Sequence, residues 1–225
     1  MTQFSATHSA PQSPAISRRT KAVWLALGGS MTLVAGLMLV LEGGPSPRAQ
    51  GLALPAAAAT TNPTSLEVIF HTKAPIQKGA WHGIVIHHSG STRGTPASIE
   101  REHLAQNLTG LGYHFVIGNG RGIADGEVHV AYRWNEQLPG AHVAGPDADR
   151  LNRSTIGICL IGDGDTKGFT DAQVRRLAEL CATLCRELGL PQDAVMLHSD
   201  VAGTTDPGRL FPEAAFRQQL ALLMQ

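Results

Sequence analysis

The sequence predicts an α/β domain in which helices flank a mixed central β-sheet. Short apolar runs bounded by glycine or polar residues, such as 84–86 and 155–161, are typical of buried strands. Longer stretches with apolar residues at helical spacing lie between these runs, as in 174–188. Strands that alternate with helices along one chain usually form a single sheet with the helices packed on its faces.

The composition fits a globular protein without a nucleic-acid partner. The chain has 225 residues, 43% of them hydrophobic, and 18 basic residues balance 18 acidic ones. This length allows one domain of ordinary size plus extra segments, and zero net charge provides no global basic surface. Three cysteines without CxxC spacing do not make a disulfide framework. We expect a monomer.

The first 64 residues differ in composition from the rest. The first segment is rich in Ser, Thr, Pro and Gln and ends in Arg18, Arg19 and Lys21, and the next 20 residues carry no charge. About 20 apolar residues span a bilayer as a helix, and a preceding basic cluster stays in the cytoplasm. The predicted order is a cytoplasmic segment (1–21), a transmembrane signal anchor (22–41), a Pro/Ala-rich linker (42–64) and a folded domain (65–225).

Two interpretations of residues 22–41 stay open. An uncleaved single-pass anchor would tether the folded domain on the extracytoplasmic side of the cytoplasmic membrane. A cleaved signal peptide would instead release the domain after export. The apolar core of a signal peptide usually has only ~7–15 residues, so the length of this segment favours the anchor.

The first half of the folded domain should contain two strands and a helix. We predict strands at Leu66–Phe70 and 84–89, because both segments are rich in apolar residues and the second lies between glycines. Thr95 followed by Pro96 is the pattern of an N-cap and a first helical residue. The helix should run to about Asn107.

The second half should alternate strands with two longer helices. Thr170 and Gln173 form a capping-box pattern, and the helix that follows should end at Gly189. Cys181 and Cys185 fall on its apolar face, so we interpret them as core thiols and not as a metal pair. The remaining predicted elements are strands at 112–117, 127–132, 155–161 (central in the sheet) and 195–198, and a closing helix at 210–224.

Two histidines end predicted strands, which makes them candidate ligands. His87 and His198 each follow an apolar run, and Asp206 comes eight residues after His198. Strand ends deliver side chains to a sheet edge, where ligands usually bind. Two imidazoles and a carboxylate with one position left open form a catalytic zinc site, whereas a structural zinc site needs four protein ligands. Taken singly, a histidine near a core is more often a structural residue than a ligand, so the case depends on all three residues together.

Five pieces of sequence carry a family resemblance: IVIHHS, LGYHFVI, GAH, STIGICLIG and HSDxxxTxDPG, in this order. On these pieces the chain resembles the type 2 N-acetylmuramoyl-L-alanine amidases, a family that includes the peptidoglycan recognition proteins, over about 83–211. The resemblance implies the amidase type 2 fold and zinc-dependent hydrolysis of the amide between N-acetylmuramic acid and L-alanine in peptidoglycan, in wall remodelling or recycling. Some members only bind peptidoglycan, so a non-catalytic binding module is the alternative.

The resemblance also implies roles for individual residues. Cys159 is a departure, because the wall-recycling members have a glutamate there that shuttles protons. The implied catalytic route therefore uses Tyr113, with Thr204 aimed at the substrate carbonyl. The implied residues are His87, His198 and Asp206 as Zn²⁺ ligands, Tyr113 and Thr204 as catalytic residues, and His142 and Arg133 as substrate contacts.

Overall fold

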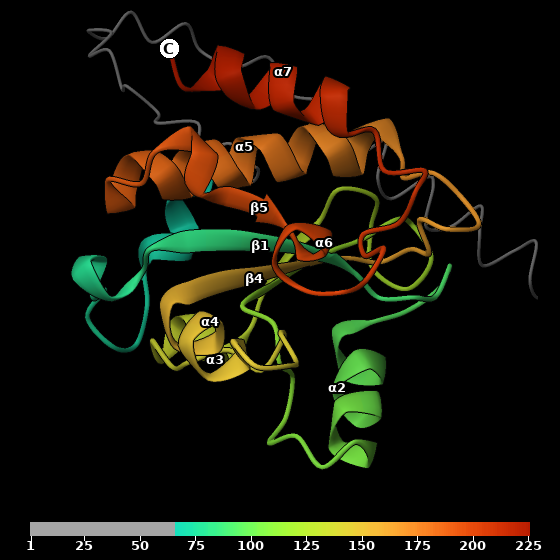
Figure 1. The fold of residues 1–225 in the computed structure, drawn as a ribbon, viewed down its shortest axis with the longest axis horizontal. Coiled ribbons are helices and arrows are strands. Elements are labelled where there is room, and N and C mark those ends of the chain that lie inside the picture. The colour runs from blue at the N-terminus through green and yellow to red at the C-terminus, as the bar shows by residue number, and fades with distance from the viewer. Residues whose placement is uncertain (1–65) are drawn as a thin grey trace, which may run out of the picture. The chain divides into compact units, whose positions relative to one another are not determined.

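A five-stranded sheet with the strand order β3-β2-β4-β1-β5 forms the centre of the domain (Figure 1). The computed structural model describes residues 66–225, which belong to one compact unit. Strand β1 pairs in parallel with β4 and β5, β2 pairs in parallel with β4, and β3 runs antiparallel to β2. The predicted mixed sheet is therefore confirmed, with β4 at its centre. The strands are β1 Gly83–His88, β2 Phe115–Ile117, β3 Val128–Val130, β4 Thr155–Leu160 and β5 Val195–Leu197.

Helices lie on both sides of this sheet. In Figure 1, α5 and α7 lie together above the strands, whereas α2, α3 and α4 lie below them. The short α6 follows β5 directly at the end of the sheet. The helices are α2 Pro96–Ala105, α3 Tyr132–Asn135, α4 Ala148–Ser154, α5 Asp171–Leu188, α6 His198–Val201 and α7 Glu213–Leu223, and the 3₁₀ segments are η1 Leu66–Phe70, η2 Lys78–Ala80 and η3 Gln192–Ala194.

The two faces of the sheet carry cores of different size. Ile84 and Ile86 of β1 belong to the large core beneath α5 and α7. Side chains alternate along a strand, so His87 points to the opposite face. A smaller cluster on that face includes Ile99 of α2, Val116 of β2 and Cys159 of β4. The apolar alternation of β1 thus directs His87 away from the main core and towards the side of α2.

The sequence signals at the helix ends are confirmed. The Thr95 side chain accepts the Ser98 N–H at 3.1 Å, and the Thr170 side chain accepts the Gln173 N–H at 3.1 Å. Gly189 ends α5 with φ 72°, in the left-handed region that glycine adopts without strain. Helix α2 ends at Ala105, two residues before the predicted end. Cys181 and Cys185 are buried free thiols in the core, as predicted.

The predicted strand at Leu66–Phe70 is wrong, because this segment is the 3₁₀ helix η1. Its Val, Ile and Phe content favours a strand, but only Ile69 is buried. The Ile69 carbonyl accepts the indole N–H of Trp134 at 2.7 Å, and the Phe70 ring packs edge-on against the same indole. These contacts with α3 determine the local conformation, which shows how tertiary packing overrides β-propensity.

Several other boundaries shift by a few residues. The strand predicted at 112–117 begins only at Phe115, because His114 is already tied to β4 by its ring. Tyr132 belongs to α3, and His198 belongs to α6 instead of the strand before it. The closing helix spans Glu213–Leu223.

The predicted N-terminal segment (1–21), the transmembrane anchor (22–41) and the linker (42–64) lie outside the described residues. Within 66–225 the longest helix is α5, which carries charged side chains along one face. No helix in this part of the chain has the length and apolar character needed to cross a membrane.

His114 connects three parts of the domain. Its Nδ1 accepts the Gly157 N–H at 3.0 Å, and its Nε2–H donates to the Leu138 carbonyl at 3.1 Å. Its ring is completely buried and packs edge-on against Trp81. Burial lowers the pKa of His114 to about 4. The folded protein therefore requires the neutral ring, because a proton on Nδ1 would displace the Gly157 hydrogen bond.

We predict that His114 makes the domain acid-sensitive. Below pH 6.5 the unfolded chain binds a proton that the folded protein excludes, so stability falls as the pH drops from about 6.5 to about 4. The shift corresponds to about 3 kcal/mol. The stability difference between wild type and His114→Leu should therefore be large at pH 7 and shrink towards pH 4, as measured by urea unfolding with chelator present.

Ile158→Val is the matched control, because it removes packing from the same strand region without removing a titratable group. Its destabilisation should be equal at both pH values. A constant difference for His114→Leu across this pH range would refute the assignment.

Candidate metal centre

His87, His198 and Asp206 converge at the carboxyl ends of β1 and β5. The parallel register pairs Ile86 with Leu197, so the residues that follow, His87 of β1 and His198 at the start of α6, stand side by side. Their ring centroids are 4.4 Å apart. Asp206 Oδ2 lies 3.0 Å from Nδ1 of His87 and 2.7 Å from Nδ1 of His198. One potential ligand atom from each residue lies within 4.8 Å of the other two.

The Asp206 carboxylate is held by its surroundings. Its Oδ1 accepts the backbone N–H of His88 at 2.6 Å, and its own N–H donates to Thr204 Oγ1 at 3.2 Å. Burial alone would raise the pKa of this carboxyl, but the neighbouring imidazoles of His198 and His87 and the His88 backbone N–H hold it far below its usual range. The carboxylate is therefore ionised at neutral pH.

The electrostatic state of the cluster suits a divalent cation. Burial lowers the pKa of His87, so its imidazole is neutral and can offer a lone pair. Two imidazole nitrogens and one carboxylate oxygen match a zinc site with an open position, and tetrahedral ligands at about 2.1 Å from zinc stand about 3.4 Å apart. The separations of 2.7 and 3.0 Å require only small adjustments to reach that value. The donor set therefore fits zinc.

His88 lies beside the cluster but uses its side chain elsewhere. Its Nδ1 accepts the Gly164 N–H at 3.0 Å, which ties the end of β1 to the loop after β4. Its Nε2 is 3.9 Å from Asp206 Oδ1, outside hydrogen-bond distance. The contribution of His88 to the cluster is thus its backbone N–H.

The partly buried Tyr113 and the fully buried Cys159 lie next to His87. The Tyr113 ring centroid lies 5.2 Å from that of His87, and its hydroxyl shares a hydrogen bond with the Cys159 thiol. Cys159 is also the residue of β4 that pairs with His87 of β1. Burial raises the pKa of both groups well above their ordinary values, so both carry their protons at neutral pH.

Two of the implied substrate contacts occupy positions that do not fit that role. Arg133 is buried, and its guanidinium donates to the carbonyls of Leu111, Thr109 and Pro139. His142 is buried behind His87, and neither of its ring nitrogens faces solvent. The sequence motifs that contain Arg133 and His142 could be recognised, but the hydrogen-bond partners of their side chains could not be predicted from the sequence.

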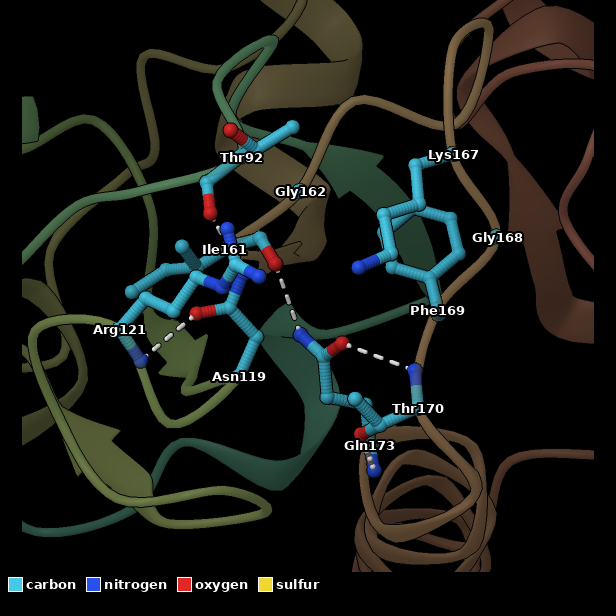
Figure 2. Close-up of a pocket in the computed structure, with 10 residues that line it drawn as sticks. All are labelled: Thr92, Asn119, Arg121, Ile161, Gly162, Lys167, Gly168, Phe169, Thr170 and Gln173. Carbon is cyan, nitrogen blue, oxygen red and sulfur yellow. Dashed lines mark hydrogen bonds between the residues drawn. The ribbon is translucent and has the colours of Figure 1, made fainter.

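A separate small pocket lies near the start of α5 (Figure 2). Figure 2 shows Lys167, Phe169 and Arg121 among its lining residues, and none of the implied site residues takes part. Gln173 forms its inner wall, where its amide donates to the Ile161 carbonyl at 2.9 Å and accepts the Thr170 N–H at 3.2 Å. The pocket is therefore distinct from the cluster of His87, His198 and Asp206.

The chain matches one known family over the region that holds this cluster. A family model described as N-acetylmuramoyl-L-alanine amidase matches residues 77–209. The endolysin of Escherichia phage T7 is 34% identical over 115 residues, and that of Klebsiella phage KP32 is 32% identical over 114 residues; each match covers 48% of this chain and 66% of the phage protein. The chain thus spans just under two thirds of these curated relatives.

A solved structure of an amidase is similar to this chain in fold. The N-acetylmuramoyl-L-alanine amidase LysC from Clostridium intestinale superposes with a TM-score of 0.55 at 26% sequence identity. The superposition covers 67% of this chain and 92% of that protein. The sheet and flanking helices of the described residues therefore have the fold of that amidase.

We predict that the purified chain binds one zinc ion at this cluster. His198→Ala removes a nitrogen donor and should abolish the bound zinc, as measured by elemental analysis after reconstitution and dialysis. His88→Ala is the matched control, because Asp206 uses the backbone N–H of His88 and that bond survives the change. Failure of the wild-type chain to retain zinc after reconstitution would rule out the site.

Proposed function

The chain belongs to the N-acetylmuramoyl-L-alanine amidase family, and on that premise we propose that it hydrolyses the amide bond between N-acetylmuramic acid and L-alanine in bacterial peptidoglycan. The observation that carries the proposal is the convergence of His87, His198 and Asp206 within the matched region. The similarity to phage endolysins and to the Clostridium amidase supports the same activity. We further propose that the protein acts as a monomer.

His87, His198 and Asp206 are the proposed zinc ligands. Zinc bound there would supply Lewis-acid chemistry, which polarises the scissile carbonyl and lowers the pKa of a water molecule. The residues provide one negative charge, because Asp206 is ionised and His87 is neutral. The cluster therefore leaves a net positive charge on a divalent ion.

Tyr113 is the proposed hydrogen-bond donor to the oxygen that gains negative charge. Its raised pKa keeps the hydroxyl protonated, so Tyr113 acts as a donor and not as a base at neutral pH. A positioned donor of this kind stabilises a developing oxyanion. The same hydroxyl can relay a proton towards the leaving amine. Cys159 is an uncharged thiol and a poor proton shuttle.

Thr204 is proposed to contact the substrate carbonyl. Its Oγ1 accepts the Asp206 N–H at 3.2 Å, and its own hydroxyl proton can still be donated to a ligand. Thr204 is exposed, as this role requires. It therefore couples the position of Asp206 to the proposed substrate.

The location proposed for this activity is outside the cytoplasmic membrane, and it rests on the sequence. The basic cluster before residues 22–41 supports an extracytoplasmic domain, tethered by a signal anchor. Fractionation of cells should recover the full-length chain with the membranes. A shortened protein free of membrane would instead indicate a cleaved signal peptide.

Digestion of purified cell walls tests the activity. Hydrolysis of the proposed bond should release peptides with a free N-terminal alanine and create no reducing sugar ends. A chelator should stop the release and added zinc should restore it. If the chain sediments with walls but releases no amino groups, it is the peptidoglycan-binding module that forms the alternative proposal.

Tyr113→Phe should retain zinc and reduce the rate of amide hydrolysis by roughly 10²–10⁴, the usual effect of losing an acid–base group. The change removes only the hydroxyl and keeps the ring next to His87. The measurements are zinc content and the rate on a muramoyl-peptide.

Cys159→Ser is the matched control, because it alters the partner of the Tyr113 hydroxyl and should affect the rate far less. If Cys159→Ser abolished turnover with fold and zinc intact while Tyr113→Phe kept near-normal turnover, the proposed roles would be reversed.

A further inference from the structure

His142 lies directly behind the proposed ligand His87, on the side away from Asp206. Its Nδ1 is 3.0 Å from Nε2 of His87, and its Nε2 is 3.2 Å from the carbonyl oxygen of Thr155. The exposed fractions are 8% for His142 and 1% for His87, so water does not compete for these contacts. Three polar groups thus form a buried chain that ends at the metal cluster.

The orientation of the His142 ring is fixed by its neighbours. Asn152 accepts the His142 N–H at 2.8 Å and so holds the backbone. A Cβ atom on Gly157 would lie 2.5 Å from Cδ2 of His142, and one on Gly140 would lie 2.3 Å from it. These two glycines therefore leave the space that the ring fills, and the ring cannot turn over freely.

The direction of each hydrogen bond follows from the Thr155 carbonyl. A carbonyl oxygen can only accept, so the His142 nitrogen facing it, Nε2, must carry a proton. His142 is buried and its two ring nitrogens face His87 and that carbonyl rather than a carboxylate, so the neutral ring is favoured and Nδ1 is an acceptor. The facing Nε2 of His87 must then be the donor, which leaves the lone pair of His87 on Nδ1.

We propose that His142 is a positioning residue that, with the Thr155 carbonyl, fixes the tautomer of His87 in which Nδ1 is free to bind the metal. The inference rests on the proposed zinc site. The competing tautomer of His87 would donate its Nδ1 proton to Asp206 and turn a lone pair towards His142. The proton of His142 would then have to move from Nε2 to Nδ1, and Nε2 would face the Thr155 oxygen without a proton between them.

This arrangement disfavours the pairing of His87 with Asp206 that would compete with a metal ion. Partners that orient a ligating histidine typically contribute about 10- to 100-fold in metal affinity. His142→Leu should therefore weaken zinc binding by the full-length chain about 10- to 100-fold, measured by competition with a chromophoric chelator. His142→Asn restores an acceptor at the position of Nδ1 and should recover most of the affinity.

His114→Leu is the matched control. His114 is also buried and makes two ring hydrogen bonds, to Gly157 and Leu138 and not to His87, and its ring packs against His142. Its replacement should destabilise the fold but leave zinc affinity near the wild-type value. A His142→Leu affinity equal to that of His114→Leu would overturn the proposal.

Nitrogen NMR of the imidazole rings gives a readout that does not depend on zinc. In the metal-free wild type, both His87 and His142 should carry their protons on Nε2. In His142→Leu, the His87 proton should move to Nδ1, next to Asp206. A wild-type His87 with its proton on Nδ1 would refute the positioning role of His142. Wild-type protein with the expected tautomers but no zinc affinity would refute only the proposed metal site.

Discussion

The parallel pairing of β1 with β5 is the constraint on which the cluster of His87, His198 and Asp206 depends. Ile84 and Ile86 pair with Val195 and Leu197, and this register brings His87 and His198 together although they are far apart in sequence. The same apolar residues bury their side chains beneath α5. A slip of one residue would turn His87 to the other face of the sheet. The register that packs the main core is therefore also the register that assembles the cluster.

Burial imposes a second condition, because a buried polar group must find a partner. Asp206 obtains one from the His88 backbone, and His142 obtains one from Thr155. Arg133 meets the condition with the carbonyls of residues just before Tyr113, including Leu111 at 2.7 Å. Its buried charge thus holds the segment that delivers Tyr113. His142 and Arg133, which the family resemblance assigned to substrate contacts, therefore hold His87 and the segment before Tyr113 in place.

Elements set by local sequence signals were predictable, whereas those set by contacts between distant segments of the chain were not. Helix α5 was predictable because its cap at Thr170, its apolar stripe and Gly189 are all local signals. The convergence of His87, His198 and Asp206 was predictable because strand ends and a family motif marked these residues. Leu66–Phe70 was predicted wrongly because the Trp134 contact that shapes it comes from a distant segment. The position of His142 depends on Thr155 and on Gly140 and Gly157, and no local sequence pattern predicts such packing.

Cys159 determines how charge is distributed around the cluster. It pairs with His87 across β1 and β4, where a carboxylate would stand buried beside Asp206. Two carboxylates in one buried site cannot both ionise without a large cost, and the pKa of one would rise. The thiol avoids this conflict because its own raised pKa keeps it neutral. Asp206 then remains the single ionised group among these residues, and the Tyr113 hydroxyl is the group left beside His87 that can donate a proton.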